Sequence, residues 1–198
     1  MQARRRGPRT RLILTLAALA SLIGGYYPGQ YWQRRPLADL SAIVYPAGRP
    51  IDYPASLGIA ADPGPNAPWR LFLTTDTRVA QCRSLLHHVA SVVNRLAAWP
   101  DIPPRLRVAM LAYDHPDADA VMQFSGGADW TEVITGEAAE LDRLSGQLGI
   151  LPGTGAWCEP SQANGILVAP NREAWALIPY AQAAIMANNI RTIIAFVE

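Results

Sequence analysis

The sequence predicts an α/β fold, a central sheet flanked by helices, preceded by one N-terminal transmembrane helix. Three observations support this prediction. Buried-strand patterns alternate with helical patterns over residues 69–197. Half of the 198 residues are hydrophobic and only 17% are charged, which is enough apolar material for a sizeable core. An arginine-rich segment followed by an apolar run opens the chain.

The N-terminal segment "RRRGPRTRLILTLAALASLIGGYYPGQYW" joins a positive flank, an apolar run and interfacial aromatics. This pattern is typical of a single-pass anchor with its N-terminus in the cytoplasm. We therefore expect a basic cytoplasmic stretch at 1–11, a transmembrane anchor at 12–32 and a Pro-rich linker at 33–68. The alternative is a cleaved secretory signal with its peptidase site at Ala18-Leu19-Ala20. Either way the body at 69–198 lies outside the cytoplasm, and we expect it in the periplasm, attached to the inner membrane.

Charge and composition exclude several function classes. The first 35 residues hold seven arginines, and the remaining 163 hold ten against all sixteen carboxylates, so the body carries about −6. An acidic body without a basic stripe argues against nucleic-acid binding. The chain has no lysine, which excludes Schiff-base and P-loop chemistry.

The body has a readable order of elements. Within the Pro-rich linker we expect at most one short strand, at 41–45. Beyond it we predict strands at 69–75 and 105–113, helices at 82–99 and 135–150, a hairpin of strands at 165–169 and 173–178, and a last helix at 183–197. Thr135 is the expected N-cap of the second helix. The order β-α-β-α-β-β-α is typical of a thioredoxin-like topology.

Four stretches, in order, resemble a known family. They are "WRLFLTTDTRVAQCRSLL", "VAMLAYDHPDAD", "WTEVITGEAAELDRLSGQLGI" and "SQANGILVAPNREAWALIPY". They resemble the Sco/SenC family, membrane-anchored thioredoxin-fold proteins that assist copper delivery to cytochrome c oxidase. The resemblance places Cys82 in the second position of the family's Cys-x-x-x-Cys loop. It also matches Asp114 to the family's Asp after the second strand.

The departures from the family pattern fall on the copper ligands. Arg78 stands in the first cysteine position, and Ser161 in the position of the ligand histidine. No histidine follows His115, so realignment does not recover that ligand. Copper(I) prefers thiolate and imidazole donors, and only Cys82 of the three remains. We therefore expect a degenerate site that binds no copper, and no other cofactor or metal.

Cys82 and Cys158 are the only cysteines, and three interpretations stay open for them. The fold implied by the resemblance brings them close enough for a structural disulfide. They could instead be two buried, unpaired thiols. The third interpretation is an active thiol site, because Cys82 near a helix N-terminus and Arg78 would have a lowered pKa.

Two other clusters of polar residues are predicted not to bind a metal. His87 and His88 lie on other sides of their helix than Cys82, which argues against a shared metal site. The run from Asp114 to Asp119 has too few oxygen ligands, and no glycine bend, for a calcium loop.

The resemblance implies an accessory protein in the assembly of a haem-copper respiratory oxidase. Because its copper ligands are lost, we expect it to act through protein contacts and without catalysis of its own. Its partners would be the lipid bilayer and oxidase subunits or another assembly factor. One alternative is a thiol-disulfide redox protein that uses Cys82. Another is a copper chaperone that uses Cys82 with Cys158.

Overall fold

The computed structural model describes residues 15–21, 37, 39–59, 67–150 and 158–198. The chain forms two units, Met1–Leu40 and Ser41–Glu198. Of the predicted anchor at 12–32, residues 15–21 are described, as helix with exposed side chains, and the rest lies outside the described residues. Among the residues that the structure describes, no helix has the length and apolar character needed to cross a membrane. The predicted transmembrane helix is therefore not shown.

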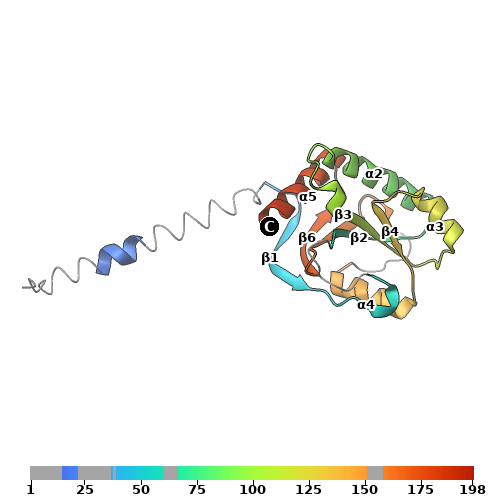
Figure 1. Cartoon of the computed structure of the whole chain (residues 1–198), viewed down its shortest axis with the longest axis horizontal. Helices are drawn as coiled ribbons and strands as arrows, with labels where there is room; N and C mark the ends of the chain where they lie inside the picture. Colours follow the sequence, from blue (N-terminus) through green and yellow to red (C-terminus); the bar gives the residue numbers. More distant parts are fainter. Residues whose placement is uncertain (1–14, 22–36, 38, 60–66, 151–157) are drawn as a thin grey trace, which may run out of the picture. The chain divides into compact units, whose positions relative to one another are not determined.

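The second unit is built on one six-stranded mixed sheet (Figure 1). The strand order is β1-β6-β5-β2-β3-β4. The strands β2, β3 and β4 run parallel, while β5 and β1 are antiparallel to their neighbours. Their bounds are β1 Ile43–Pro50, β2 Trp69–Thr75, β3 Leu106–Ala112, β4 Thr131–Ile134, β5 Asn164–Val168 and β6 Glu173–Pro179.

Helices cover both faces of this sheet. Figure 1 shows α2 and α5 side by side on one face and α4 on the other. The helix α3 lies beside β4 at the end of the sheet. The bounds are α2 Ala80–Leu96, α3 Ala118–Ser125, α4 Ala138–Leu148 and α5 Ala183–Val197, with short 3-10 turns at Ala55–Leu57 and Pro103–Arg105.

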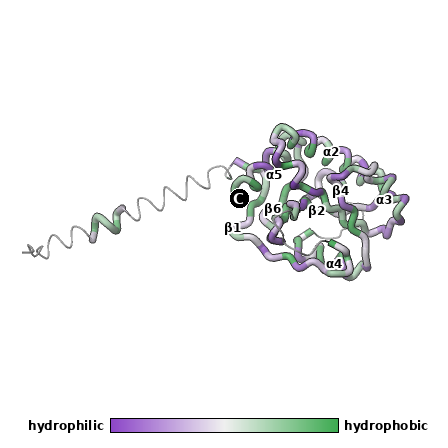
Figure 2. The backbone as a smooth tube through the Cα atoms, in the orientation of Figure 1, coloured by the Kyte–Doolittle hydropathy of each residue, from purple (hydrophilic) through white to green (hydrophobic). Residues whose placement is uncertain are grey.

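The core follows from the spacing of apolar residues. Along α2 the buried side chains recur every three or four residues, which gives one apolar face. The tube in Figure 2 accordingly alternates between hydrophobic and hydrophilic residues along the helices that cover the sheet. The strand β2 is buried along its whole length because it lies between two other strands and under helices on both faces. This central position fixes the loop that follows β2, which contains Arg78 and leads into α2, where Cys82 lies.

Most predicted elements of the body are confirmed. The strand at 69–75 and the helix at 183–197 match β2 and α5 residue for residue, and the predicted hairpin is β5 with β6. The helix at 135–150 is present as α4, but its N-cap is Glu137, and the prediction of Thr135 was wrong. Thr135 and Gly136 lie between β4 and the helix, outside both elements.

Two elements, α3 and β4, were not predicted. The acidic stretch that contains Asp117 was interpreted as a loop, yet Asp117 is the N-cap of α3, and its Oδ1 accepts a hydrogen bond of 2.8 Å from the Ala120 amide. This is a standard helix-start signal that the surrounding acidic residues obscured. The strand β4 has only four residues, too few for a clear alternation.

The predicted linker at 33–68 needs a correction. Its residues 43–50 form β1, which pairs with β6 at the edge of the sheet. Ile51, Tyr53, Leu57 and Ile59 are buried in the core on the α4 face. The folded body therefore begins at Ser41, 28 residues before the predicted boundary at residue 69. Pro46 and Pro50 indicated a spacer, but prolines are also tolerated on an edge strand.

Candidate functional site

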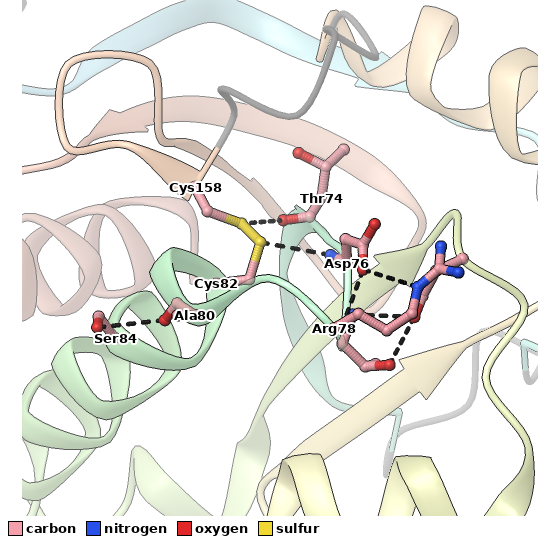
Figure 3. Close-up of a disulfide and its surroundings, with 9 residues drawn as sticks. Thr74, Asp76, Arg78, Ala80, Cys82, Ser84 and Cys158 are labelled. Carbon is pink, nitrogen blue, oxygen red and sulfur yellow. Dashed lines mark hydrogen bonds and ion pairs between the residues drawn. A yellow bond between two sulfur atoms is a disulfide. The ribbon is translucent and has the colours of Figure 1, made fainter.

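The candidate site is the loop from Asp76 to Val79, which joins β2 to α2. Cys82 lies in the first turn of α2 with 0% exposure. Its Sγ accepts a hydrogen bond of 3.4 Å from the Asp76 amide, so the cysteine holds the loop against the helix start (Figure 3).

Cys82 is joined to Cys158 by a disulfide (Figure 3). Their Cα atoms are 4.8 Å apart, although 76 positions separate them in the sequence. Cys158 is 3% exposed, and its Sγ lies 3.9 Å from the Thr74 carbonyl oxygen at the end of β2. The structure thus has the first of the three arrangements open from the sequence, and neither cysteine is a free thiol. The bond ties the start of α2 to the segment that leads into β5.

Arg78 lies in this loop and faces solvent. Its side chain is 73% exposed. The guanidinium Nε lies 3.4 Å from Oδ1 of Asp76 and 3.6 Å from Oδ2 of Asp114. The backbone amide of Arg78 also donates to Oδ1 of Asp76, at 2.9 Å. The first cysteine position of the resemblance is therefore occupied by a cation held by two carboxylates.

Asp114 is the buried member of this cluster. Only 1% of its side chain is exposed. Its Oδ2 accepts hydrogen bonds from the Thr77 amide at 3.1 Å and from the Thr77 hydroxyl at 2.5 Å. Its Oδ1 is shielded from solvent and has no hydrogen-bond partner among the described residues. A carboxylate from the end of β3 thus fixes the loop after β2.

The histidine position of the resemblance gives no ligand. Ser161 is exposed, in a turn that follows Cys158. Of the three histidines, His87 and His115 are exposed, while His88 stacks on Tyr180 with ring centroids 4.4 Å apart. The Nε2 atom of His88 lies 2.9 Å from the Ala181 carbonyl oxygen, so His88 packs α2 against the chain before α5.

Copper(I) does not fit this set of side chains. The two sulphur atoms are bonded to each other, Arg78 is cationic, and Ser161 offers a hard hydroxyl oxygen. Across the described part of the chain, no group of three His, Cys, Asp or Glu side chains is placed to hold a metal ion. The arrangement is suited to holding the loop after β2 and the start of α2 rigid.

Thr77 is the site residue that sequence reasoning missed. Its role depends on Asp114, which lies 37 positions away and reaches it only because β2 and β3 are parallel neighbours. The available signal was the position of Asp114 directly behind a buried strand. In a parallel sheet, such a residue lies beside the loop that follows the next strand.

Comparison with solved structures identifies proteins with a similar fold. No protein-family model matches the chain, and no curated protein matches it in sequence. Among solved structures, it is similar to copper-bound ScoI of Arabidopsis thaliana, with a TM-score of 0.54 and 10% identity over 65% of this chain and 85% of that one. Apo Sco1 of Thermus thermophilus gives a TM-score of 0.54 and 13% identity over 79% of this chain and 96% of that one.

A third similar structure is BsSco, described as a member of the Sco family of cytochrome c oxidase assembly proteins. Its TM-score is 0.52, with 14% identity over 66% of this chain and 81% of that one. At such low identities the structural similarity establishes the fold alone, and the function has to be argued from the site. The chain has a Sco-like thioredoxin fold, with the disulfide Cys82–Cys158 and Arg78 where the loop after β2 meets α2.

Proposed function

We propose that this chain is a membrane-anchored, extracytoplasmic accessory protein in the assembly of a respiratory haem-copper oxidase. It acts through protein contacts and does not carry copper. The observation that carries the proposal is the Cys82–Cys158 disulfide within a Sco-like fold. This bond occupies the second cysteine position of the resemblance, while Arg78 occupies the first.

In this proposal the disulfide links the two segments that a copper site would otherwise link. In the resemblance, the loop of Cys82 and the segment of Ser161 carry the copper ligands. Cys158 lies three residues before Ser161, so the disulfide links the same two segments covalently. The covalent bond would hold these two segments together without a bound ion.

The proposed location rests on the sequence and the disulfide together. The arginine-rich start and the apolar run at 12–32 favour an anchor with the body outside the cytoplasm. Structural disulfides persist in oxidising compartments, which suits a periplasmic body.

Affinity purification of the full chain from detergent-solubilised membranes tests the proposal. We expect oxidase subunits, or a second chaperone with an intact copper site, to co-purify. The control is a tagged, unrelated single-pass protein of the same membrane, which should recover neither. Recovery of an unrelated complex alone would contradict the assembly role.

A thiol-disulfide redox function is the second candidate. It is favoured by the position of Cys82 in the first turn of α2, four residues after Arg78. A helix N-terminus and a nearby cation both favour a thiolate. In that function a partner dithiol would attack one sulphur, and its two electrons and two protons would convert the disulfide to two thiols. The burial of both sulphur atoms opposes such attack.

Stopped-flow reduction of the native protein by dithiothreitol separates the two functions. A structural disulfide reacts orders of magnitude more slowly in the folded protein than in the unfolded protein. Reduction in the folded state at the rate of an exposed disulfide would favour the redox function.

The copper-chaperone alternative needs the reduced protein, through Cys82 and Cys158, to retain copper(I) against a competing chelator. Our proposal expects the chelator to remove it.

A further inference from the structure

The strand β4 ends the sheet on the side away from β1. It pairs with β3 and with no other strand of the described sheet. The Val108 amide donates to the Trp130 carbonyl at 2.8 Å, which fixes which backbone groups of β4 face β3. In a parallel ladder the groups of alternate residues face the same side. The amide and carbonyl of Val133 and the carbonyl of Thr131 therefore point away from β3, towards the open edge.

A groove runs along this edge between β4 and α3. Its volume is about 540 Å³, and its lining includes Met122, Asp129, Thr131, Val133 and Thr135. We call it the β4 groove. Met122 is 63% exposed, the largest exposed fraction among the large hydrophobic side chains of the described chain. The groove thus offers an apolar contact beside unpaired backbone groups.

A second groove of about 410 Å³ adjoins the β4 groove and shares Pro116 and Thr135 with it. Its lining includes Glu137 and Glu140. Together the two grooves extend past the end of β4 towards α4. Two adjoining grooves along one edge suit an extended chain better than a compact ligand.

The charge around the two grooves has one sign. Residues 114–142 hold eight of the sixteen carboxylates and no arginine. Two of the eight are paired, Asp114 with Arg78 and Glu132 with Arg70. Asp129, Glu137 and Glu140 line the grooves, and no arginine lines either one. A bound segment with positive side chains would meet a carboxylate in each of the two grooves and no like charge in either.

The opposite edge of the sheet lacks these properties. The strand β1 contains Pro46 and Pro50, and its pairing with β6 is interrupted between Val44 and Arg49. Prolines and bulges protect an edge from further pairing. The edge formed by β4 contains no proline and no lysine or arginine.

We propose that the open edge of β4 binds an extended basic segment of a partner protein, which adds as a further strand beside β4. Its arginine or lysine side chains lie near Asp129 and Glu137, and its apolar side chains cover Met122 and Val133. This is strand addition, in which main-chain hydrogen bonds supply affinity and the groove supplies selectivity. A second copy of this chain is a poor occupant, because self-pairing would bring two acidic segments together. The inference deepens the proposed function, and rests on it in assigning the segment to an assembly partner.

Binding of a synthetic peptide to the detergent-solubilised full chain tests the inference. The probe is an acetylated, amidated peptide of alternating Arg and Val, and the control peptide has Glu in place of Arg. We expect the Arg peptide alone to bind, more weakly as salt is raised. Hydrogen exchange should then show slowed exchange at the Val133 amide. Binding without protection of Val133 would overturn strand addition.

Two matched comparisons separate strand addition from general charge attraction. The variant Asp129→Asn/Glu137→Gln should weaken binding by about fivefold, the loss of two exposed ion pairs. The control Asp101→Asn/Glu159→Gln changes the net charge equally at exposed positions outside both grooves and should bind as the wild type does. Peptides N-methylated at one or the other alternate set of amides should differ, one binding and the other not. Equal binding by both variants, or by both methylated peptides, would contradict the inference.

The purification test distinguishes this inference from the proposed function. If the peptide binds at β4 but oxidase subunits are not recovered, the surface stands and the assembly role fails. If Asp129→Asn/Glu137→Gln recovers oxidase subunits as well as the wild type does, the role stands and the docking surface fails. Protection of Val133 that rises with protein concentration in the absence of peptide would indicate self-association and overturn the proposed occupant.

Discussion

The Nε atom of Arg78 lies 3.6 Å from Oδ2 of Asp114, a carboxylate whose side chain is 99% buried. The two partners of this pair are unequal. Arg78 is largely in solvent, where ion pairs contribute little. Asp114 is buried and also accepts two hydrogen bonds from Thr77. We infer that Thr77, more than Arg78, holds Asp114 and the loop together.

Replacing Asp114 and Arg78 separately should therefore have different effects. Asp114→Ala leaves the amide and hydroxyl of Thr77 without their acceptor and should lower the free energy of unfolding by about 2–3 kcal/mol. Arg78→Ala should cost less than about 1 kcal/mol. Urea denaturation of the two variants measures both values. An equal loss in Arg78→Ala would show that the ion pair dominates.

Removal of the disulfide should destabilise the fold strongly. A loop closed over 76 positions contributes about 4–5 kcal/mol in the chain-entropy model. We expect Cys82→Ser/Cys158→Ser to lose about that much unfolding free energy, measured by chemical denaturation. The matched control is reduced wild type, which should unfold at the same denaturant concentration. A double variant as stable as the oxidised protein would mean that the bond restrains little.

Thiol chemistry gives an independent check on the same bond. Both cysteines are buried and paired, so a thiol reagent should label neither in the folded, unreduced protein. After unfolding and reduction it should label two. Rapid labelling of Cys82 in the native protein would instead support the redox alternative.

Stability should fall at alkaline pH because of Tyr53. Burial raises the pKa of Tyr53 from 10 to about 12, with the Arg70 charge opposing this in part. The contribution of Tyr53 to the free energy of unfolding is fully present below pH 10, the pKa in the unfolded chain. It is lost as pH rises through 12, because the unfolded chain releases this proton at a lower pH than the folded protein does. A two-unit shift corresponds to roughly 2–3 kcal/mol. Tyr53→Phe should flatten this decline in denaturation curves taken between pH 10 and 12. Burial also raises the pKa of Tyr113, so Tyr53→Phe should retain a smaller decline.

Restoring the donor set of the resemblance should create copper binding. The variant Arg78→Cys/Ser161→His/Cys158→Ser frees Cys82 and supplies two thiolates and one imidazole, which are soft donors. After reduction, we expect it to retain copper(I) against a chelator that strips the wild type. Copper analysis after desalting measures this. Retention by the reduced wild type would contradict the proposal that this chain carries no copper.

The elements that sequence reasoning identified correctly are those with a strong, continuous pattern. The whole of β2 is buried, and the buried residues of α5 recur at helical spacing, so their bounds could be predicted exactly. A short strand was expected at 41–45, but β1 runs on to Pro50, and its prolines led to its being placed in a linker. Only its pairing with β6 reveals its place, and that partner lies at the other end of the chain.

The candidate site was predictable to a similar degree. Its positions came from the resemblance, which located Cys82, Arg78 and Ser161 in the fold. The joining of Cys82 to Cys158 was one of three open interpretations, because sequence alone does not give the Cα separation. The link from Asp114 to Thr77 could not be predicted, since it depends on the alignment of two parallel strands.

The pairing of β1 with β6 has a consequence for synthesis of the protein. Ile43 lies opposite Leu177, a partner made 134 positions later. The sheet therefore cannot be completed until nearly the whole chain has left the ribosome, and such non-local contacts slow folding. Throughout that interval the first strand is exposed to wrong pairings, a hazard that chaperones usually suppress.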